Sequence, residues 1–525
     1  MANKNLFRTI AGALLPKTNM VNEAGGIAYA LENEHALAQY AATGCLNSTY
    51  YASAEEQLDK ILQLCEKASP DFIAKTAVYA REKGFMKDLP ALLCAVLTMR
   101  SPELCEKIFG RVIDSPKMLR NFVQIIRSGV VGRKSLGTQP KRLIRNWLES
   151  RSDEQLFNSS VGNDPSLADV IKMVHPKPQC ASREALFGYL IGRQHDAEAL
   201  PEIVRQYEKF KYVVGTGNRP HEVPDVPFQM LTALKLQTAE WKTIAKNAPW
   251  QMTRMNLNTF ARHGVFESPE ITKLIADRLR NAELIVRARV FPYQLMMAYT
   301  QAVDVPRMIR EALQDAMEIA IQNVPKVEGK VYVCPDVSGS MHSPVTGYRQ
   351  GATSAVRCID VAALVAAAML RKNPDTEVIP FHDSVARREL NPRDSVMTNA
   401  NVLTSIPSGG TNCSAPLVEL NRVKAKGDLI IYVSDNESWV DSPHYGRFGG
   451  GATQTMQQWA EFKRRSPNAK MICIDIQPYA HTQAKERDDI VNVGGFSDQV
   501  FTLIAETATG NTKDHWVNTI RSIVL

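Results

Sequence analysis

The 525-residue chain lacks several patterns that would place it in a special class of protein. Its nine cysteines are dispersed, with no CxxC pair, and several lie in apolar runs such as LLCAVL. This excludes a zinc ribbon and argues against a disulfide framework. No stretch approaches the ~18 apolar residues of a membrane span. The N-terminal run MANKNLFRTIAGALLP, broken by Arg8 and Pro16, is unlike a signal peptide. We therefore expect a folded, cytoplasmic protein.

Basic residues are in excess, but only in one part of the chain. The formal net charge is +7 at pH 7. Residues 1–325 contain 41 Lys and Arg against 34 Asp and Glu, whereas residues 326–525 contain 21 of each kind. A polyanionic partner would therefore be expected to contact the first part of the chain.

Hydrophobic periodicity divides the chain at the same place. From residue 22 to about residue 323, apolar residues recur at helical spacing, and no β-type alternation precedes residue 326. Ser-Pro pairs begin several of these segments, with Ser as the expected N-cap and Pro in the first helical turn. They are Ser69-Pro70, Ser101-Pro102, Ser115-Pro116 and Ser268-Pro269. Many short helices with short connections favour HEAT-like stacked helical pairs, so residues 1–325 are predicted to form a helical-repeat module.

After Pro325, short apolar runs alternate with helical stretches. The runs are typical of strands buried on both faces, and they occupy 330–336, 376–381, 428–435 and 470–476. Helices are expected at 354–371, 414–424, 452–465 and 497–508. This order predicts a doubly wound α/β domain over residues 326–525, with a mostly parallel sheet that binds ligands at the carboxyl ends of its strands.

Oxygen-bearing residues gather at that expected edge. In DVSGSM, Asp336 ends a predicted strand, and Ser338 and Ser340 follow at two-residue spacing. Thr411 in SGGTNCSAP and Asp435 at the end of DLIIYVSD lie in two later loops at the same edge. Five oxygen donors with only two carboxylates suit Mg²⁺ or Mn²⁺ better than Zn²⁺. We predict that these five residues hold a divalent cation, Mg²⁺.

The DxSxS segment taken alone would also fit a capped turn or a phosphatase. A capped turn needs only this short stretch, but the Thr and Asp in two later loops favour the cation site. A phosphatase with Asp336 as nucleophile would need a second acid for proton transfer where Ser338 stands. No GxxxxGK[ST] loop is present to bind ATP phosphates. We therefore do not expect an enzyme.

Positive charge in the helical part is concentrated in residues 111–151, which contain ten Lys or Arg and two acids. Such clustering is what phosphate binding needs, although a solvated helix face is the simpler alternative. The candidate RNA-contacting residues here are Arg120, Arg127, Arg133, Lys134, Lys141, Arg142 and Arg145. His175, in MVHPKPQ, is by its chemistry alone more typical of a helix end.

The five-residue set resembles the metal-ion-dependent adhesion site of von Willebrand factor A domains. The resemblance implies that the two serines bind the ion directly and that Asp336 and Asp435 act mainly through water. Thr411 would join or leave the coordination shell as ligands change. Extracellular relatives use the site for adhesion, whereas no export signal is recognisable in this chain.

A basic helical module followed by such a domain resembles the Ro autoantigen family, whose N-terminal module is called TROVE. The resemblance is carried by AGGIAYAL, STYYAS, GRKSLG, KRLIRNWL, ADVIKMVHPKP, PDVSGSM, SGGTNCSAPL and YVSDNESW. It implies a ring of helical repeats closed by the A domain, with small noncoding Y RNAs on the outer basic surface. Single-stranded ends of misfolded RNAs would enter the central hole. It also implies that His175, in HPKP, contacts Y RNA.

One segment departs from the family pattern. It reads LFNSSVGNDPSLAD, with Asn158 and Gly162 where relatives have RNA-binding cations, and basic residues 127–145 would compensate. Bacterial members bind Y-like RNA and can be tethered by it to polynucleotide phosphorylase. The resemblance thus implies a cytoplasmic RNA-binding protein of noncoding RNA quality control, with no DNA partner. The alternative is a protein-interaction scaffold whose cation captures an acidic side chain of a partner.

Overall fold

The computed structural model describes residues 15–525 apart from several short segments. These are 23–24, 44–47, 49–51, 163–164, 219–221, 289–291, 322–323, 325, 346, 349–355, 439–451, 478, 496–498 and 509–515. The chain forms two compact units. One comprises Met1–Leu89, Phe291–Gln294 and Ile321–Val524, and the other Pro90–Val290 and Leu295–Ala320. The first 89 residues are therefore grouped with the α/β part, while the expected boundary at Pro325 lies outside the described residues.

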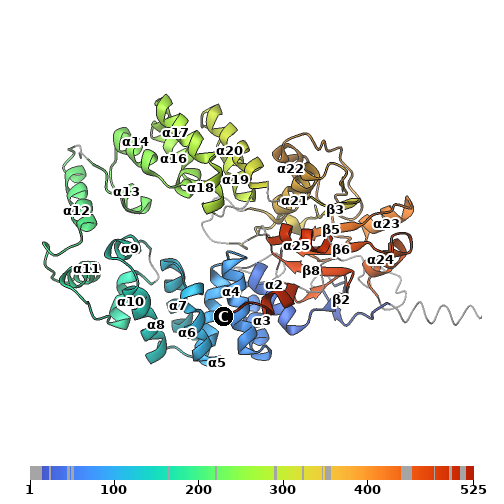
Figure 1. Cartoon of the computed structure of the whole chain (residues 1–525), viewed down its shortest axis with the longest axis horizontal. Helices are drawn as coiled ribbons and strands as arrows, with labels where there is room; N and C mark the ends of the chain where they lie inside the picture. The colour runs from blue at the N-terminus through green and yellow to red at the C-terminus, as the bar shows by residue number, and fades with distance from the viewer. Residues whose placement is uncertain are drawn as a thin grey trace, which may run out of the picture. The chain divides into compact units, whose positions relative to one another are not determined.

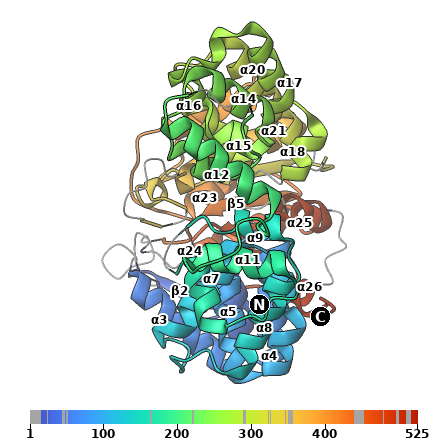
Figure 2. The same ribbon diagram turned by 90° about the vertical axis from the view of Figure 1, so that its left-hand side faces the viewer.

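The second unit is built from short helices. They are α5 (Asp88–Arg100), α6 (Pro102–Val112), α7 (Pro116–Ser128), α8 (Thr138–Glu149), α9 (Asp153–Asn158), α10 (Leu167–Val174), α11 (Ala181–Ile191), α12 (Glu202–Gly215), α13 (Phe228–Thr232), α14 (Thr238–Asn247), α15 (Trp250–Met255), α16 (Leu257–Arg262), α17 (Pro269–Leu279), α18 (Ala282–Ala288), α19 (Pro292–Gln301) and α20 (Arg307–Ala320). Neighbouring helices stack: α10 packs on α7, α8 and α11, and α17 packs on α14 and α20 (Figures 1 and 2). The predicted HEAT-like helical architecture is confirmed. No helix in the described ranges is both long and apolar enough to cross a membrane.

All four Ser-Pro pairs begin helices, as predicted, but they do so in two ways. The Oγ atoms of Ser69 and Ser115 accept hydrogen bonds from the backbone N–H groups of Phe72 and Met118, at 3.2 and 3.4 Å. Ser101 and Ser268 precede α6 and α17 without a side-chain cap. At these two positions, the start of the helix is marked by proline alone.

This difference predicts unequal effects of two similar substitutions in the helical unit. Ser115→Ala is expected to lower the free energy of unfolding by about 1 kcal/mol, because the N–H of Met118 loses its acceptor. Ser101→Ala is the matched control and should cost a few tenths of that, about 0.3 kcal/mol. Urea unfolding followed by circular dichroism measures both. Equal losses in the two variants would contradict the assignment of the caps.

The first unit is organised around a five-stranded parallel sheet with the order β4-β3-β5-β6-β8. Its strands are β3 (Val331–Pro335), β4 (Glu377–Val378), β5 (Leu429–Ser434), β6 (Lys470–Asp475) and β8 (Ile490–Gly494). Its helices are α21 (Cys358–Lys372), α22 (Val396–Thr404), α23 (Ala415–Arg422), α24 (Gln454–Arg465), α25 (Gln499–Ala508) and α26 (Trp516–Arg521). The predicted α/β fold is confirmed. The strand β8 and the helices α22 and α26 were not expected.

The expectation that no strand precedes residue 326 is wrong. β1 (Met20–Val21) and β2 (Ile27–Ala30) form a hairpin, and β2 pairs with β7 (His481–Thr482) in a small antiparallel sheet. Strands of two and four residues are too short to show alternation, and the partner of β2 is remote in sequence. The helices α2 (Asn33–Thr43), α3 (Ala54–Lys67) and α4 (Pro70–Glu82) follow, and α2 packs against β8.

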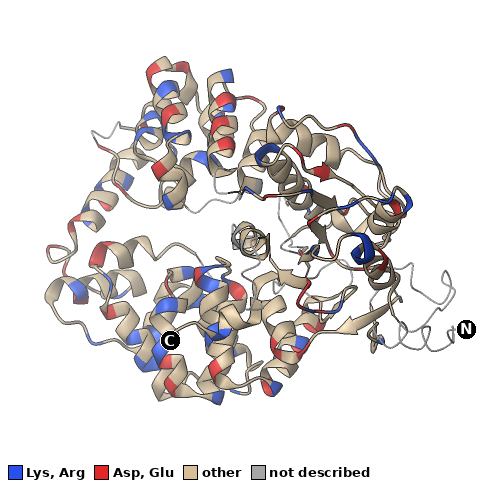
Figure 3. Cartoon of the chain, turned by 45° about the vertical axis from the view of Figure 1, so that its right-hand side comes forward, with Lys and Arg blue, Asp and Glu red and all other residues tan. Residues whose placement is uncertain are grey.

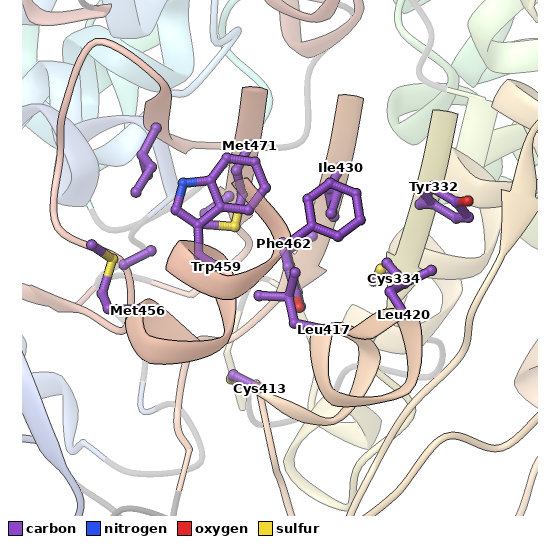
Figure 4. Packing of buried hydrophobic residues seen from close by; sticks show 14 of the residues in the cluster. Tyr332, Cys334, Cys413, Leu417, Leu420, Ile430, Met456, Trp459, Phe462 and Met471 are labelled. Atoms are coloured by element: carbon purple, nitrogen blue, oxygen red, sulfur yellow. The ribbon is translucent and has the colours of Figure 1, made fainter. Parts of the chain in front are cut away.

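One face of the parallel sheet is covered by α23 and α24. Figure 4 shows Trp459 and Phe462 of α24 lying over Ile430 and Met471 of the sheet. The two rings are stacked with centroids 5.7 Å apart, and the Trp459 Nε1 atom donates to the Asp489 carboxylate at 3.0 Å. The opposite face carries α21, which packs against β3, β4 and β5. Burial on both faces explains the continuous apolar strand sequences.

Candidate functional site

The sheet order places a topological switch point between β3 and β5. From β3 the chain passes to β4 on one side and then crosses over to β5 on the other side of β3. Asp336 follows the last residue of β3, and Asp435 follows the last residue of β5. Ligands of open α/β sheets bind at such a point. The two carboxylates predicted to surround the cation therefore flank this crevice.

The DVSGSM loop turns back on itself at the end of β3. The backbone N–H of Ser338 donates to the Asp336 Oδ1 atom at 2.8 Å, and the Oγ atoms of Ser338 and Ser340 are 3.3 Å apart. The Ser340 hydroxyl also interacts with the Asp435 carboxylate. Four of the five predicted ligands are thus brought together by side-chain contacts. Each of the four is at most 4% exposed.

The loop that contains Thr411 is joined to the DVSGSM loop by a backbone hydrogen bond. The N–H of Gly339 donates to the carbonyl of Gly409 at 2.9 Å, which joins the DVSGSM loop to the SGGTN loop. The N–H of Gly410 donates to the Asp383 carboxylate at 2.9 Å. Thr411 is itself buried, at 3% exposure. The structure therefore brings all three predicted loops to one edge, with the five oxygen-bearing residues shielded from water.

Burial dominates the electrostatics of this site. Removal from water raises the pKa of Asp336 to about 6, although hydrogen bonds from Ser338 and Ser434 act in the opposite direction. Burial and the negative charge of Asp336 raise the pKa of Asp435 well above its usual range. Two adjacent buried carboxylates repel each other unless a positive charge lies between them. A bound cation would provide that charge.

The donors fit a hard divalent cation. Carboxylate and hydroxyl oxygens are what Mg²⁺ and Mn²⁺ prefer, whereas Zn²⁺ prefers nitrogen and sulfur. Among the residues that the structure describes, no group of three or more His, Cys, Asp or Glu side chains is arranged to hold a metal. Asp336, Ser338, Ser340, Thr411 and Asp435 would hold the ion, directly or through water.

The candidate RNA-contacting residues fall into two groups, and the first surrounds α10. Arg145 of α8 donates from its Nε atom to the carbonyl of Val174 at 2.5 Å, beside His175. His175 caps α10 in a left-handed conformation (φ 48°), and its side chain is exposed. Hydrogen bonds from Ser166 lower the pKa of Asp169 in the first turn of α10, and the positive charge of Arg127 acts in the same direction. Arg145 therefore contacts the C-terminal end of α10, while Arg127 acts on its first turn through its charge.

Arg120 completes this group and lies on α7, as Arg127 does. Burial lowers the pKa of its guanidinium. Its Nε and Nη1 atoms are buried and have no hydrogen-bond partner among the described residues. A Cβ atom at Gly162 (φ 110°) would overlap the Arg120 guanidinium, so the glycine leaves the space that this group occupies. We call Arg120, Arg127, Arg145 and His175 the α10 cluster.

The remaining basic residues are committed elsewhere or more exposed. Arg133 folds back on its own loop, donating to the carbonyls of Ser135 and Leu136 at 2.9 and 2.7 Å. Lys134 is exposed, and Lys141 is half-buried. Arg142 is exposed and forms an ion pair with Glu106 of α6 at 2.5 Å. Figure 3 shows Lys and Arg on successive helices of this unit. Lys141 and Arg142 share α8 with Arg145 of the α10 cluster, whereas Arg133 and Lys134 lie in the loop between α7 and α8.

Comparisons with known proteins support the resemblance. A family model of the Ro60 vWA domain matches residues 330–508. The RNA-binding protein RO60 of Deinococcus radiodurans is 23% identical over 96% of this chain and 99% of its own length. The chain is thus similar to a Ro protein over almost its whole length. The RNA-binding protein RO60 of Caenorhabditis elegans is 22% identical over 51% of this chain and 42% of its own length.

The fold of the chain agrees with a solved structure. The crystal structure of the Deinococcus radiodurans RO (RSR) protein matches it with a TM-score of 0.60 and 20% identity. The match covers 92% of this chain and 100% of that one. Both the helical part and the α/β part therefore share the Ro architecture.

Sequence reasoning missed several buried residues that lie beside the loops of the candidate cation site. Ser434 donates to the Asp336 Oδ2 atom at 2.6 Å and accepts from the N–H of Asn436 at 2.9 Å. Asn436 adopts a left-handed conformation (φ 65°), which asparagine tolerates better than most residues. The Glu437 Oε1 and His481 Nε2 atoms are 2.9 Å apart, and both side chains are buried. Ser434 was open to prediction, because it immediately precedes Asp435 at a strand end, but His481 was not.

Proposed function

We propose that this protein binds small structured noncoding RNA of the Y type and takes part in noncoding RNA quality control. The observation that carries the proposal is the α10 cluster, in which arginines from α7 and α8 and a histidine surround one short helix. The similarity to proteins named RNA-binding protein RO60 supports it. The role is one of binding and not of catalysis.

Two nitrogens of Arg120, Nε and Nη1, have no hydrogen-bond partner in the described part of the chain. Arg120 as a whole is only half-buried, so we propose that its charge remains available to a phosphate oxygen through a charge-assisted hydrogen bond. Arg120 also lies against Gly162. Its charge would replace the cation that relatives have at the position of Gly162. Exposed His175 adds a ring on which an unpaired base can stack.

Single-stranded ends of misfolded RNA are the second proposed ligand. Such ends would be held through phosphates with little reading of base sequence, so a free unpaired end would be the feature selected. A Y-like RNA could also tether polynucleotide phosphorylase, as the family resemblance implies. These partners are proposed on resemblance and on the charge excess of residues 1–325.

The proposal is tested by removing basic residues of α8. The triple variant Lys141→Ala/Arg142→Ala/Arg145→Ala should bind a Y-like RNA about tenfold more weakly at 0.1 M salt, since each lost phosphate contact removes released counterions. The loss is moderate because Arg142 is paired with Glu106 and Arg145 with a carbonyl. Filter binding across a salt series measures both the affinity and its salt dependence.

A matched control removes the same charge from another helix of the unit. Lys235→Ala/Lys242→Ala/Lys246→Ala lies on and just before α14, and it should leave RNA binding within about twofold of wild type. If the α8 variant bound RNA as tightly as wild type at every salt concentration, the role of this surface would be refuted.

We also propose that the five-residue site holds Mg²⁺. When bound, the ion supplies a Lewis acid that accepts an anionic oxygen from a ligand. The supporting observation is the pair of buried carboxylates with raised pKa values beside three hydroxyls. The same site would serve a second candidate function, capture of an acidic side chain of a protein partner. RNA recovered with the protein by crosslinking in its own cell separates that scaffold role from RNA binding.

A further inference from the structure

Ser438 lies at a junction between the cation site and the N-terminal segment. It follows Asp435 by three residues and is fully buried. Its Oγ atom accepts a hydrogen bond from the backbone N–H of Cys413 at 3.3 Å, and Cys413 follows Thr411 by two residues. Its carbonyl accepts a hydrogen bond from the Asn22 Nδ2 atom at 2.7 Å. One residue therefore connects the loops of two predicted ligands with a third segment.

In the third segment, two hydrogen bonds join Asn22 and Gly26, and we call this closure the Asn22 turn. The N–H of Asn22 donates to the carbonyl of Gly26 at 2.8 Å, and the N–H of Gly26 donates to the Asn22 Oδ1 atom at 2.6 Å. The oxygen of the Asn22 amide thus closes the turn, while its nitrogen binds Ser438. Because both ends of the amide are engaged and Asn22 is only 5% exposed, its orientation is fixed.

The backbone of this turn also touches Ser438 closely. A Cβ atom at Gly26 would overlap the Ser438 carbonyl oxygen, so any side chain there must displace the turn or the loop. A second contact anchors the same segment nearby. The Gln39 Nε2 atom of α2 donates to the Asp475 carboxylate at 2.8 Å, at the end of β6. The N-terminal segment thus binds the carboxyl edge of the sheet at two adjacent strands.

We propose that the Asn22 turn is a positioning element of the cation site. The inference rests on the proposed cation site. Asn22 is not a ligand. It holds Ser438, and Ser438 sets the distance between the Asp435 loop and the Thr411 loop. A site whose donors are already arranged binds an ion more tightly than one that the ion must organise.

The test is direct cation binding to the full chain. Titration with Mn²⁺, followed by electron paramagnetic resonance of the free ion, should give one site in the wild type. Asn22→Ala should weaken Mn²⁺ binding about tenfold, which corresponds to about 1.4 kcal/mol. Gly26→Ala should weaken it similarly, because it displaces the turn while Asn22 remains.

Asn19→Ala is the matched control in the same hairpin. The Asn19 Oδ1 atom accepts from the N–H of Ala30 at 2.8 Å, away from Ser438, so its removal should leave the Mn²⁺ affinity unchanged. If the wild type bound no Mn²⁺, the cation site itself would be refuted. If the wild type bound the ion and both Asn22→Ala and Gly26→Ala bound it equally well, only the positioning role would be overturned. Should one variant not fold, the other decides.

Discussion

Asp336→Asn is expected to abolish binding of a divalent cation while leaving RNA affinity within about twofold of wild type. The amide keeps an oxygen that accepts from Ser338 or Ser434 but removes one of the two carboxylate charges that an ion would neutralise. At a Mg²⁺ concentration 100 times its dissociation constant, the ion should raise the free energy of unfolding of the wild type by about 2.7 kcal/mol. The variant should show no such increase.

Thermal unfolding with and without Mg²⁺ measures this difference, and filter binding measures the RNA. Asp375→Asn is the control, because Asp375 is an exposed acid of the same unit, next to β4. It should retain the full Mg²⁺ effect. A folded Asp336→Asn protein that had lost most of its RNA affinity would show that the cation and RNA sites are not independent.

The double variant Arg120→Met/Arg127→Gln is expected to weaken Y-like RNA binding by about a hundredfold at 0.1 M salt. Two charge-assisted hydrogen bonds to phosphate, each of about 1.5 kcal/mol, account for a loss of this size. The same change should not destabilise the protein. Methionine fills the space of the Arg120 stem and removes buried N–H groups that lack a partner among the described residues. A gain of about 1 kcal/mol in the free energy of unfolding is expected.

Opposite changes in affinity and stability would distinguish a binding residue from a structural one. Urea unfolding and filter binding on the same preparation measure the two quantities. Arg205→Met/Arg307→Gln is the control, because these arginines form local ion pairs with Glu202 and Glu311 in the same unit. It should change neither quantity by more than about 0.5 kcal/mol. A double variant that lost stability and kept its RNA affinity would assign Arg120 to the core.

The sequence predicts the centre of the α/β sheet well and its margins poorly. β3, β5 and β6 lie within the predicted runs, because strands buried on both faces consist almost entirely of apolar residues. β8 was not predicted, because Asn492 interrupts its apolar run. The Asn492 Oδ1 atom accepts a hydrogen bond from the hydroxyl of Thr482 in β7. β4 has only two residues where six were expected. The limits of these outer strands depend on contacts with residues remote in sequence, which a local sequence pattern does not reveal.

The cation site shows the same limit. Asp336, Ser338 and Ser340 belong to one short motif, so their convergence follows from local spacing. The contact between Asn22 and Ser438 joins residues 416 positions apart, and nothing in either local sequence announces it. Arg120 was selected for its charge, but the absence of a hydrogen-bond partner for two of its nitrogens within the described part of the chain is a property of the packing.

The pairing of β2 with β7 also determines when the molecule can finish folding. Tyr29 of β2 pairs with Thr482 of β7. The pairing of the two strands therefore cannot form until the chain has been synthesised beyond residue 482. At about 5–20 residues per second, that interval is roughly 20–90 s. The helical unit, whose contacts are mostly between neighbours in sequence, can form during this time. The N-terminal hairpin is thus among the first segments made and the last to complete its sheet.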